Sequence, residues 1–218
     1  MKVLITGTTS GIGSHIHKFA DWDIVHLNRD TVDLDYPDRI WSGHVPPVDV
    51  VINNAGHDMG GKVLFADHAF DSWQRIINTN LVSAMRITQL AVQKNPNLTV
   101  VNITSTNLDR YWGNDLVYSL TKAALLEFGK MLMVDYPSVT VKEVRLGLTR
   151  TEFNANRHKP DHKPVDDLYA NECLDPFLVA SKIVDFVNDH AGTDVRLGNT
   201  LMIIPGKIVM AGICIIGT

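Results

Sequence analysis

The chain has 218 residues, of which 45% are apolar and 20% charged, and its formal net charge is −4. This length and composition are typical of one globular unit with a substantial core, so we expect residues 1–218 to form a single domain. The negative balance argues against a protein that binds nucleic acid through phosphate contacts. Cys173 and Cys214 form no ligand or redox pattern, and we expect two buried, reduced thiols.

Neither end of the chain predicts a membrane segment. A strand-like run begins at Lys2 and leaves no room for a signal peptide before it, so we expect a cytoplasmic protein. The apolar run from Ile208 to Ile216 is too short to span a bilayer. We interpret this run as a buried strand or a subunit contact.

Strand-like and helix-like segments alternate along the chain. Short apolar, β-branched runs predict strands near 2–6, 23–27, 48–53, 98–104, 139–145 and 200–204. Helical periodicity predicts helices near 11–20, 68–94, 115–136 and 176–190. The alternation predicts an α/β fold: a doubly wound, Rossmann-like parallel sheet flanked by helices on both faces, with ligands at the carboxyl ends of its strands. Between the second and third strands, three prolines leave room for at most one brief helix.

A glycine-rich turn joins the first predicted strand to the first helix, with the spacing Gly-x-x-x-Gly-x-Gly. Such a turn lets the backbone approach a pyrophosphate closely, and the free N–H groups at the helix N-terminus stabilise its negative charge. The alternative is an ordinary turn between a strand and a helix. We expect nucleotide contacts from Gly7, Thr9, Ser10, Gly11, Ile12 and Gly13.

Tyr118 and Lys122 lie four residues apart in a predicted helix, and Ser105 lies 13 residues upstream of Tyr118. Positions i and i+4 share one helix face, so the phenol and the ammonium can point the same way. A neighbouring cation favours the phenolate and lowers the pKa of a tyrosine towards the working range of an acid or base. Tyr-x-x-x-Lys alone is a weak signal that an ordinary surface helix also carries.

Four blocks together resemble the short-chain dehydrogenase/reductase superfamily. They are Thr6-Gly7-x-x-x-Gly11-Ile12-Gly13, Asn53-Asn54-Ala55-Gly56, Asn80 within Asn78-Thr79-Asn80-Leu81, and Ser105 with Tyr118-x-x-x-Lys122. Their order and spacing are similar to the family from residue 2 to about residue 206. The resemblance implies hydride transfer between a nicotinamide and a carbonyl or alcohol.

The resemblance also implies a role for each matching residue. Tyr118 is expected to be the general acid or base, and Lys122 is expected to lower its pKa and to contact the nicotinamide ribose. Ser105 is expected to orient the substrate oxygen, and Asn80 to hold a water that links Lys122 to bulk solvent. His57, next to the asparagine block, is expected to have no direct role.

The choice of cofactor is made after the second predicted strand, where NAD-dependent folds place an acidic residue. Here Asn28 fills that position without charge, and Arg29 offers a planar fork suited to a 2′-phosphate. We therefore expect NADP(H) to be preferred and NAD(H) to remain possible. Arg29 is alternatively a solvated turn residue that Asp30 could pair with.

Further cofactor contacts are implied by the resemblance alone. Asp33, followed by Leu34, matches the position that meets the adenine amino group, and Asn54, Ala55 and Gly56 border the adenine ribose. Gly147, Leu148 and Thr151 match a segment that fixes the nicotinamide carboxamide. Leu146 stands where that segment usually has a proline.

The substrate is the least defined part of the sequence. Two segments, 106–117 and about 152–175, are expected to line the substrate site. The first contains Asn107, Tyr111 and Trp112, which either stack on a ring or simply pack. The second is polar and rich in cations, which is typical of a solvated lid and alternatively of a site for an anionic or polyhydroxylated substrate.

Partners and rival functions complete the expectations. A small carbonyl or alcohol is the expected substrate, with no metal, nucleic acid or membrane partner; His158 and His162 in a proline-broken loop form no metal pair. Family analogy favours a homodimer or homotetramer through the helices near 68–94 and 115–136. The rivals are a non-catalytic NADP-binding regulator and a nucleotide-sugar-modifying enzyme of the family's extended branch, which carries a larger C-terminal substrate domain.

Overall fold

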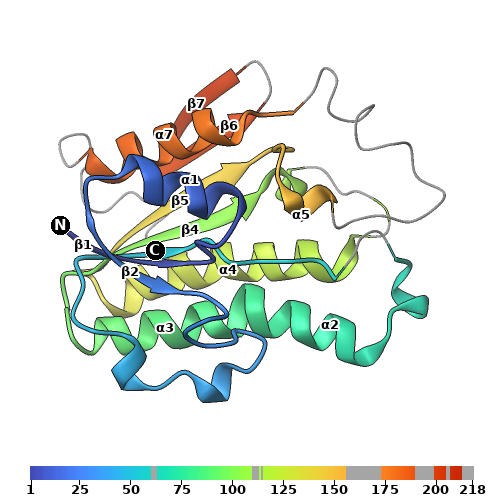
Figure 1. Ribbon diagram of the computed structural model, residues 1–218, viewed down its shortest axis with the longest axis horizontal. Helices are drawn as coiled ribbons and strands as arrows, with labels where there is room; N and C mark the ends of the chain where they lie inside the picture. Colours follow the sequence, from blue (N-terminus) through green and yellow to red (C-terminus); the bar gives the residue numbers. More distant parts are fainter. Residues whose placement is uncertain are drawn as a thin grey trace.

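The computed structural model describes residues 1–59, 63–109, 113, 115–155, 173–189, 199–204 and 207–212 (Figure 1). The strands are β1 (Lys2–Thr6), β2 (Asp23–Leu27), β3 (Val50–Asn53), β4 (Thr99–Ser105), β5 (Thr140–Leu146), β6 (Asn199–Ile204) and β7 (Lys207–Gly212). The helices are α1 (Gly11–Phe19), α2 (Phe70–Ile77), α3 (Ser83–Val92), α4 (Leu116–Asp135), α5 (Glu152–Ala155) and α7 (Pro176–Asn188). A π-helical segment, Asn78–Val82, joins α2 to α3 and is called the π turn below.

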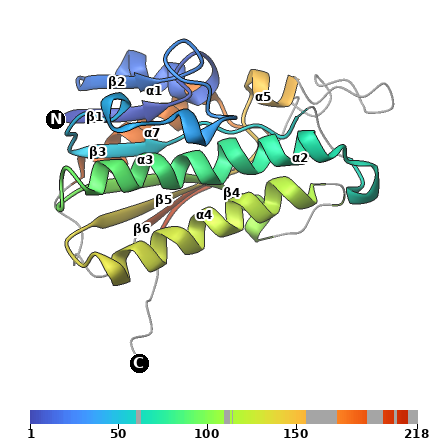
Figure 2. The ribbon, with the colours of Figure 1, turned by 90° about the horizontal axis from the view of Figure 1, so that it is seen from below.

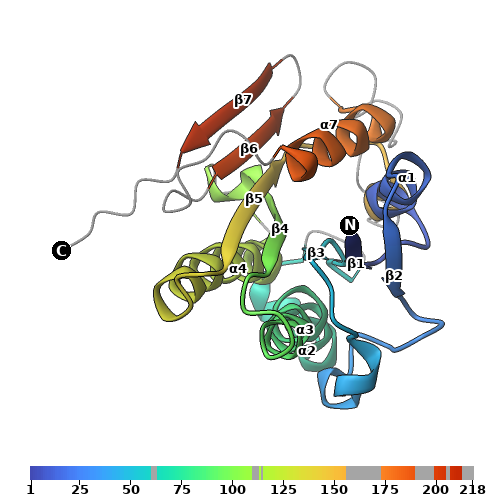
Figure 3. The ribbon, with the colours of Figure 1, turned by 90° about the vertical axis from the view of Figure 1, so that its left-hand side faces the viewer.

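The seven strands form one sheet in the order β2-β1-β3-β4-β5-β6-β7 (Figure 3). Neighbouring strands from β2 to β6 run parallel, and β7 returns antiparallel to β6. The order reverses beside β1, because the chain goes from β1 outwards to β2 and then back across β1 to β3. Ligands of doubly wound sheets bind outside the strand ends at such a reversal. The predicted fold class is confirmed.

Helices cover both faces of the sheet. Figure 3 shows α1 and α7 above one face and α2, α3 and α4 below the other. The central strands are apolar on both sides, as buried parallel strands are, and each face closes its own core. Fully buried Ile5 and Ile52 face α1 and α7, while fully buried Leu4 and Val51 face α3 and α4.

The connection from β2 to β3 is short, as expected. It contains no α-helix, only the 3-10 turns Pro37–Arg39 and Ser42–His44. Ile40 and Val45 of this connection are fully buried and complete the core beneath β1 and β3. A doubly wound sheet of the common order has a further strand outside β2; this chain instead uses a loop, which holds itself to the rest of the protein by side-chain contacts described below.

Three expectations need adjustment. The helix predicted near 68–94 is interrupted by the π turn, which period counting does not reveal (Figure 2). The apolar C-terminal run does form a strand, β7, over Lys207–Gly212. The buried thiol predicted at Cys173 is wrong, because this side chain is partly exposed and receives an N–H from Arg150 at 3.6 Å; Cys214 lies outside the described residues. Within the described ranges, no helix is long and apolar enough to cross a bilayer.

Candidate functional site

The glycine turn after β1 has the tight geometry that its spacing predicts. Gly7 and Gly11 have φ angles of 70° and 54°, which other residues adopt only with strain. A Cβ atom on Gly13 would lie 2.2 Å from the carbonyl oxygen of Gly7, so any side chain there would push the turn apart. The turn therefore requires glycine for its shape and leaves its backbone open to a ligand.

The start of α1 already contacts an anion in this structure. The backbone N–H of Gly11 donates to Oε2 of Glu152, at 3.3 Å, and Glu152 is the first residue of α5. The side chain of Ser10, at the N-cap position, makes no capping bond to the helix. Thr9 and Ser10 are exposed, whereas Ile12 packs on the core. Because a carboxylate oxygen occupies this N–H, the turn fits a phosphate oxygen chemically.

The asparagine block after β3 holds the glycine turn in place. Nδ2 of Asn54 donates to the carbonyl oxygens of Thr6 and Gly7, at 2.9 and 3.1 Å. Oγ1 of Thr6 in turn accepts the backbone N–H groups of Asn54 and Ala55. A Cβ atom on Gly7 would lie 3.0 Å from Cα of Ala55, so the two backbones touch. The block thus fixes the site instead of merely bordering it.

The segment after β2 places the expected specificity residues at the protein surface. Oδ1 of Asn28 accepts the N–H of Asp30, at 3.0 Å, which fixes the turn. Arg29 is exposed, and no ion pair between Arg29 and Asp30 occurs among the described contacts. Asp33 is partly buried and its Oδ1 accepts the N–H of Asp35, whereas the side chain of Leu34 is buried in the core.

Tyr118 and Lys122 of α4 share one face of the helix, as predicted. Nζ of Lys122 lies 5.7 Å from the centroid of the Tyr118 ring and donates to the carbonyl oxygen of Ile103, at 2.8 Å. Only 4% of Lys122 is exposed, and burial lowers its pKa to about 8. A buried ammonium that meets a carbonyl and an aromatic face is a perturbed group of the kind that marks functional sites.

Asn80 lies in the π turn, which rotates it towards the loop after β3. Its Oδ1 accepts the N–H of His57, at 2.9 Å, and its Nδ2 donates to the carbonyl of His57, at 3.0 Å, and to Oγ1 of Thr121, at 3.2 Å. A Cβ atom on Gly56 would lie 3.2 Å from Oδ1 of Asn80 and 3.4 Å from Nζ of Lys122. Asn80 and Lys122 therefore flank Gly56 from two sides, and single π turns often occur where function needs such placement.

Ser105 ends β4 and is buried. Its Oγ accepts the N–H of Asn107, at 3.2 Å, which starts the 3-10 turn that follows. Nδ2 of Asn107 lies 3.3 Å from Oδ2 of Asp115 and 3.4 Å from Oγ of Ser119. Asn107 thus braces the segment between β4 and α4 and is no simple surface residue.

The segment after β5 reaches across to the glycine turn. Leu148 and Arg150 exchange backbone hydrogen bonds with Leu174, at 2.8 and 3.0 Å, so this loop is braced although Leu146 replaces the usual proline. A Cβ atom on Gly11 would lie 3.5 Å from the side chain of Thr151, and Oγ1 of Thr149 donates to the carbonyl of Gly147. Figure 1 shows α5 just beyond the arrowheads of β4 and β5. Phe153 of α5 lies 5.6 Å from Tyr118, ring centroid to ring centroid.

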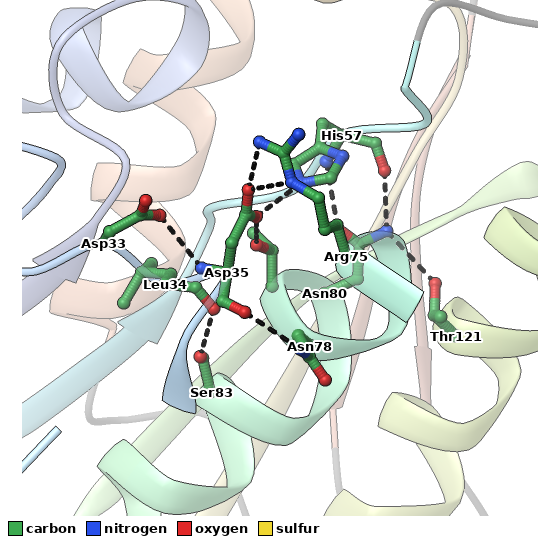
Figure 4. Close-up of polar contacts among 10 residues, drawn as sticks. Asp33, Leu34, Asp35, His57, Arg75, Asn78, Asn80, Ser83 and Thr121 are labelled. Atoms are coloured by element: carbon green, nitrogen blue, oxygen red, sulfur yellow. Dashed lines mark hydrogen bonds and ion pairs between the residues drawn. The ribbon is translucent and has the colours of Figure 1, made fainter. Parts of the chain in front are cut away.

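A buried carboxylate that the sequence did not single out lies beside these residues (Figure 4). Asp35 is 4% exposed and accepts hydrogen bonds from Thr79, from Nε2 of His57 at 2.9 Å and from Nε of Arg75 at 2.6 Å. Burial raises the pKa of Asp35, but the bonds from Thr79, His57 and Arg75 outweigh this and leave the pKa below its usual value. We call Asp35, His57, Arg75 and Thr79 the Asp35 cluster.

Asp35, Thr121 and Glu152 are the contributors that the sequence did not reveal. Their partners lie 22 to 44 residues away for Asp35, 41 for Thr121 and 141 for Glu152. Tyr111, Trp112, His158 and His162 lie outside the described residues, as does most of the loop predicted over 152–175. Within the described ranges no group of three or more potential metal ligands occurs.

Comparison with known proteins decides the family. The family model for short chain dehydrogenases matches residues 39–162, which is more than half of the chain and includes Asn80, Ser105, Tyr118 and Lys122. The chain belongs to the short-chain dehydrogenase family. The resemblance inferred from four sequence blocks is thereby confirmed.

Individual relatives agree with this membership. An NADP-dependent 3-hydroxy acid dehydrogenase from Schizosaccharomyces pombe is 33% identical over 146 residues, which are 63% of this chain and 55% of the relative. The chain spans about half the length of such curated relatives, or less.

Solved structures of this family share the fold. A 3-ketoacyl-(acyl-carrier-protein) reductase from Brucella melitensis complexed with NADH has a TM-score of 0.78 at 16% identity, with 94% of this chain and 97% of that chain covered. A serine dehydrogenase complexed with NADP+ has a TM-score of 0.76 at 21% identity, with both chains fully covered.

Proposed function

We propose that the protein is an NADP(H)-dependent oxidoreductase that transfers a hydride between nicotinamide and a carbonyl or alcohol substrate. The observation that carries this proposal is the buried ammonium of Lys122 beside the ring of Tyr118, at the end of the sheet where the glycine turn lies. Family membership and the names of the relatives support it. When bound, the nicotinamide supplies or accepts the hydride.

The side chains divide the remaining work. Tyr118 protonates the substrate oxygen during reduction and takes the proton back during oxidation. Lys122 keeps positive charge next to the phenol and lowers the pKa of Tyr118. Ser105 would turn its hydroxyl from the N–H of Asn107 towards the substrate oxygen, and Asn80 would hold the water that returns protons to Lys122.

The cofactor would lie along the glycine turn, with its pyrophosphate on the N–H groups at the start of α1. Exposed Arg29 is available for a 2′-phosphate, and Asp33 keeps one carboxylate oxygen beyond its bond to Asp35 for the adenine amino group. Asn54, Ala55 and Gly56 form the surface that the adenosine half would cover, and Gly147, Leu148 and Thr151 lie where the carboxamide would bind.

Turnover of NADPH with a panel of carbonyl compounds tests the activity, with NADH run in parallel. We expect consumption of NADPH with at least one carbonyl and a lower rate with NADH. Tyr118→Phe should abolish turnover, by about 10²–10⁴-fold, while NADPH affinity stays nearly unchanged. Retained turnover in that variant would remove the acid role of Tyr118, and binding of NADPH without any turnover would favour a non-catalytic regulator.

The exposed apolar side chains of α4 support a homo-oligomer. Leu120, Met131 and Val134 are 61%, 67% and 68% exposed, and Met85 of the adjacent α3 is 41% exposed. Apolar surface of this kind on two neighbouring helices is typical of a subunit contact (Figure 2). Sedimentation of the wild type and of Met131→Glu tests this, because a charge in a helix-to-helix contact should dissociate the oligomer and leave a monomer unchanged.

A further inference from the structure

We propose that Asp35, acting through His57, is a positioning residue for Asn80, and this inference rests on the function proposed above. The residues come from three separate parts of the chain: the loop after β2, the loop after β3 and the π turn (Figure 4). Family matching does not single out Asp35 or the ring of His57. Their role follows from how the hydrogen bonds of the Asp35 cluster are divided.

The two carboxylate oxygens of Asp35 face different partners. Oδ1 accepts from Nε2 of His57 and from Oγ1 of Thr79, the residue before Asn80. Oδ2 accepts from the guanidinium of Arg75, whose side chain is 45% exposed. One oxygen is therefore committed to the surroundings of Asn80, and the other to a cation at the surface.

His57 is held at both of its ends. Its ring bonds to Asp35, and its backbone N–H and carbonyl both bond to the side chain of Asn80. Nδ1 of the same ring is buried and has no partner among the described residues, so the bond from Nε2 to Asp35 is the described polar anchor of the ring. Removing that anchor frees the residue that supplies two of the three hydrogen bonds of the Asn80 side chain.

Asp35 is itself fixed firmly enough to act as an anchor. Its N–H donates to Oδ1 of Asp33, and its carbonyl accepts from Nδ2 of Asn78, at 2.8 Å. The carbonyl of Leu34 accepts from Oγ of buried Ser83, at 2.6 Å. The loop that replaces a further strand is thus attached at several points to the helix that carries Asn80, and it holds the carboxylate at a set distance from His57.

The consequence reaches Lys122 through Gly56. Asn80 and Lys122 lie on either side of Gly56, which leaves no side chain between them, and Asn80 also bonds to Thr121, the neighbour of Lys122. If His57 loses its anchor, Asn80 loses its fixed orientation towards Lys122, and proton return to Tyr118 becomes slower. Cofactor affinity is affected less, because the glycine turn and Asn54 make no contact with the Asp35 cluster.

Three single variants separate positioning from plain stability. Asp35→Asn and His57→Leu both disturb the Asp35–His57 bond, so we expect kcat to fall about tenfold in each with a small change in KM for NADPH. The double variant should be no slower than the slower single one, because both remove the same contact. His57→Gln keeps a donor that can reach Asp35 and should recover most of the lost kcat.

Arg75→Gln is the matched control. It removes an ion pair from the same carboxylate but leaves the His57 bond, so it should lower the melting temperature without lowering kcat. The pH profile of kcat, which reports the Tyr118–Lys122 pair, should shift in His57→Leu and stay unchanged in Arg75→Gln. An equal fall of kcat in Arg75→Gln, or a wild-type kcat in folded His57→Leu, overturns the proposal.

A measurement on the protein without cofactor or substrate keeps the test independent of turnover. The side-chain amide protons of Asn80, assigned in an NMR spectrum by comparison with Asn80→Ala, should exchange slowly in the wild type and in Arg75→Gln. They should exchange at least tenfold faster in His57→Leu and Asp35→Asn. Unchanged exchange overturns the positioning role even if the protein turns over, whereas an inactive wild type with the expected exchange pattern overturns only the proposed function.

Discussion

Asp35 and Lys122 are equally buried, each 4% exposed, yet their surroundings treat their charges in opposite ways. Asp35 meets an arginine, a histidine and a hydroxyl, and its pKa falls in the direction that keeps it charged. Lys122 meets the carbonyl of Ile103 and an aromatic face, no ion pair to it occurs among the described residues, and its pKa falls to about 8, the direction that favours loss of charge. Burial alone therefore does not mark a functional group; burial without a compensating partner does.

The largest effect should follow from Lys122→Met, which removes the uncompensated charge and keeps an unbranched side chain. We expect NADPH turnover to fall by about 10²–10⁴-fold. Stability should rise, because replacing an unpaired buried charge by an apolar side chain removes a cost. Thermal unfolding and turnover assays check both, with Lys130→Met on the exposed face of α4 as control. A less stable Lys122→Met protein would show that the cation is better solvated than its burial indicates.

Asp35→Asn should have the opposite stability effect, since it breaks a compensated network. Loss of a buried, paired carboxylate costs about 3–5 kcal/mol, and for a domain of this size that corresponds to a fall in Tm of roughly 6–20 °C. Calorimetry at pH 7 measures it. Arg75→Gln should cost less, because its guanidinium is 45% exposed and water replaces part of the lost contact.

The pH dependence of stability should separate the same two groups. Lys122 has a folded pKa of about 8 and an ordinary value of 10.5, so the unfolded chain binds more protons between these values and stability rises with pH across that window. The rise should amount to about 3 kcal/mol and be missing in Lys122→Met. Urea unfolding between pH 7 and 10 tests it.

The sign is different on the acid side. The folded pKa of Asp35 lies below 3.8, so its contribution is fully present above that pH and is lost as the pH falls through the folded value. Asp35→Asn should therefore lose less stability than the wild type on acidification below pH 4. Equal acid limbs for the two proteins would mean that other carboxylates dominate acid unfolding.

The smallest effect should come from an exposed ion pair, Glu127 with Lys130, at 2.6 Å on α4. Glu127→Gln should change stability by less than about 0.5 kcal/mol, because solvent screens the pair and its geometry costs side-chain freedom. Chemical denaturation resolves this limit. A larger loss would show that this face of α4 is covered by another subunit.

The sequence predicted most of the fold because its strands and helices carry long, regular apolar patterns. The strands from Lys2 and Asp23 match the predicted bounds, and α4 differs from its prediction by one residue at each end. The pair Tyr118 and Lys122 was equally accessible, because four residues on a helix are neighbours in space. The π turn was not, since one extra residue per turn shifts the register without changing the composition.

The Asp35 cluster shows why part of the site could not be predicted. Asp35 follows Asp33 and precedes Asp38 in a loop of ordinary acidic composition, and nothing local distinguishes it. Its environment is created by His57, Arg75 and Thr79, which fold onto it from two later segments. His57 was expected to have no direct role; its ring makes the bond on which the positioning proposal depends.

The carboxylate of Glu152 on the first N–H of α1 has one more consequence. A phosphate that takes this N–H must displace Glu152, so nucleotide entry would be a swap of one anion for another and not the filling of a bare turn. The measured affinity would then be a difference between two contacts. The start of α5 would be released at the moment of loading, and the loop beyond it would report by its own motion whether the nucleotide has arrived.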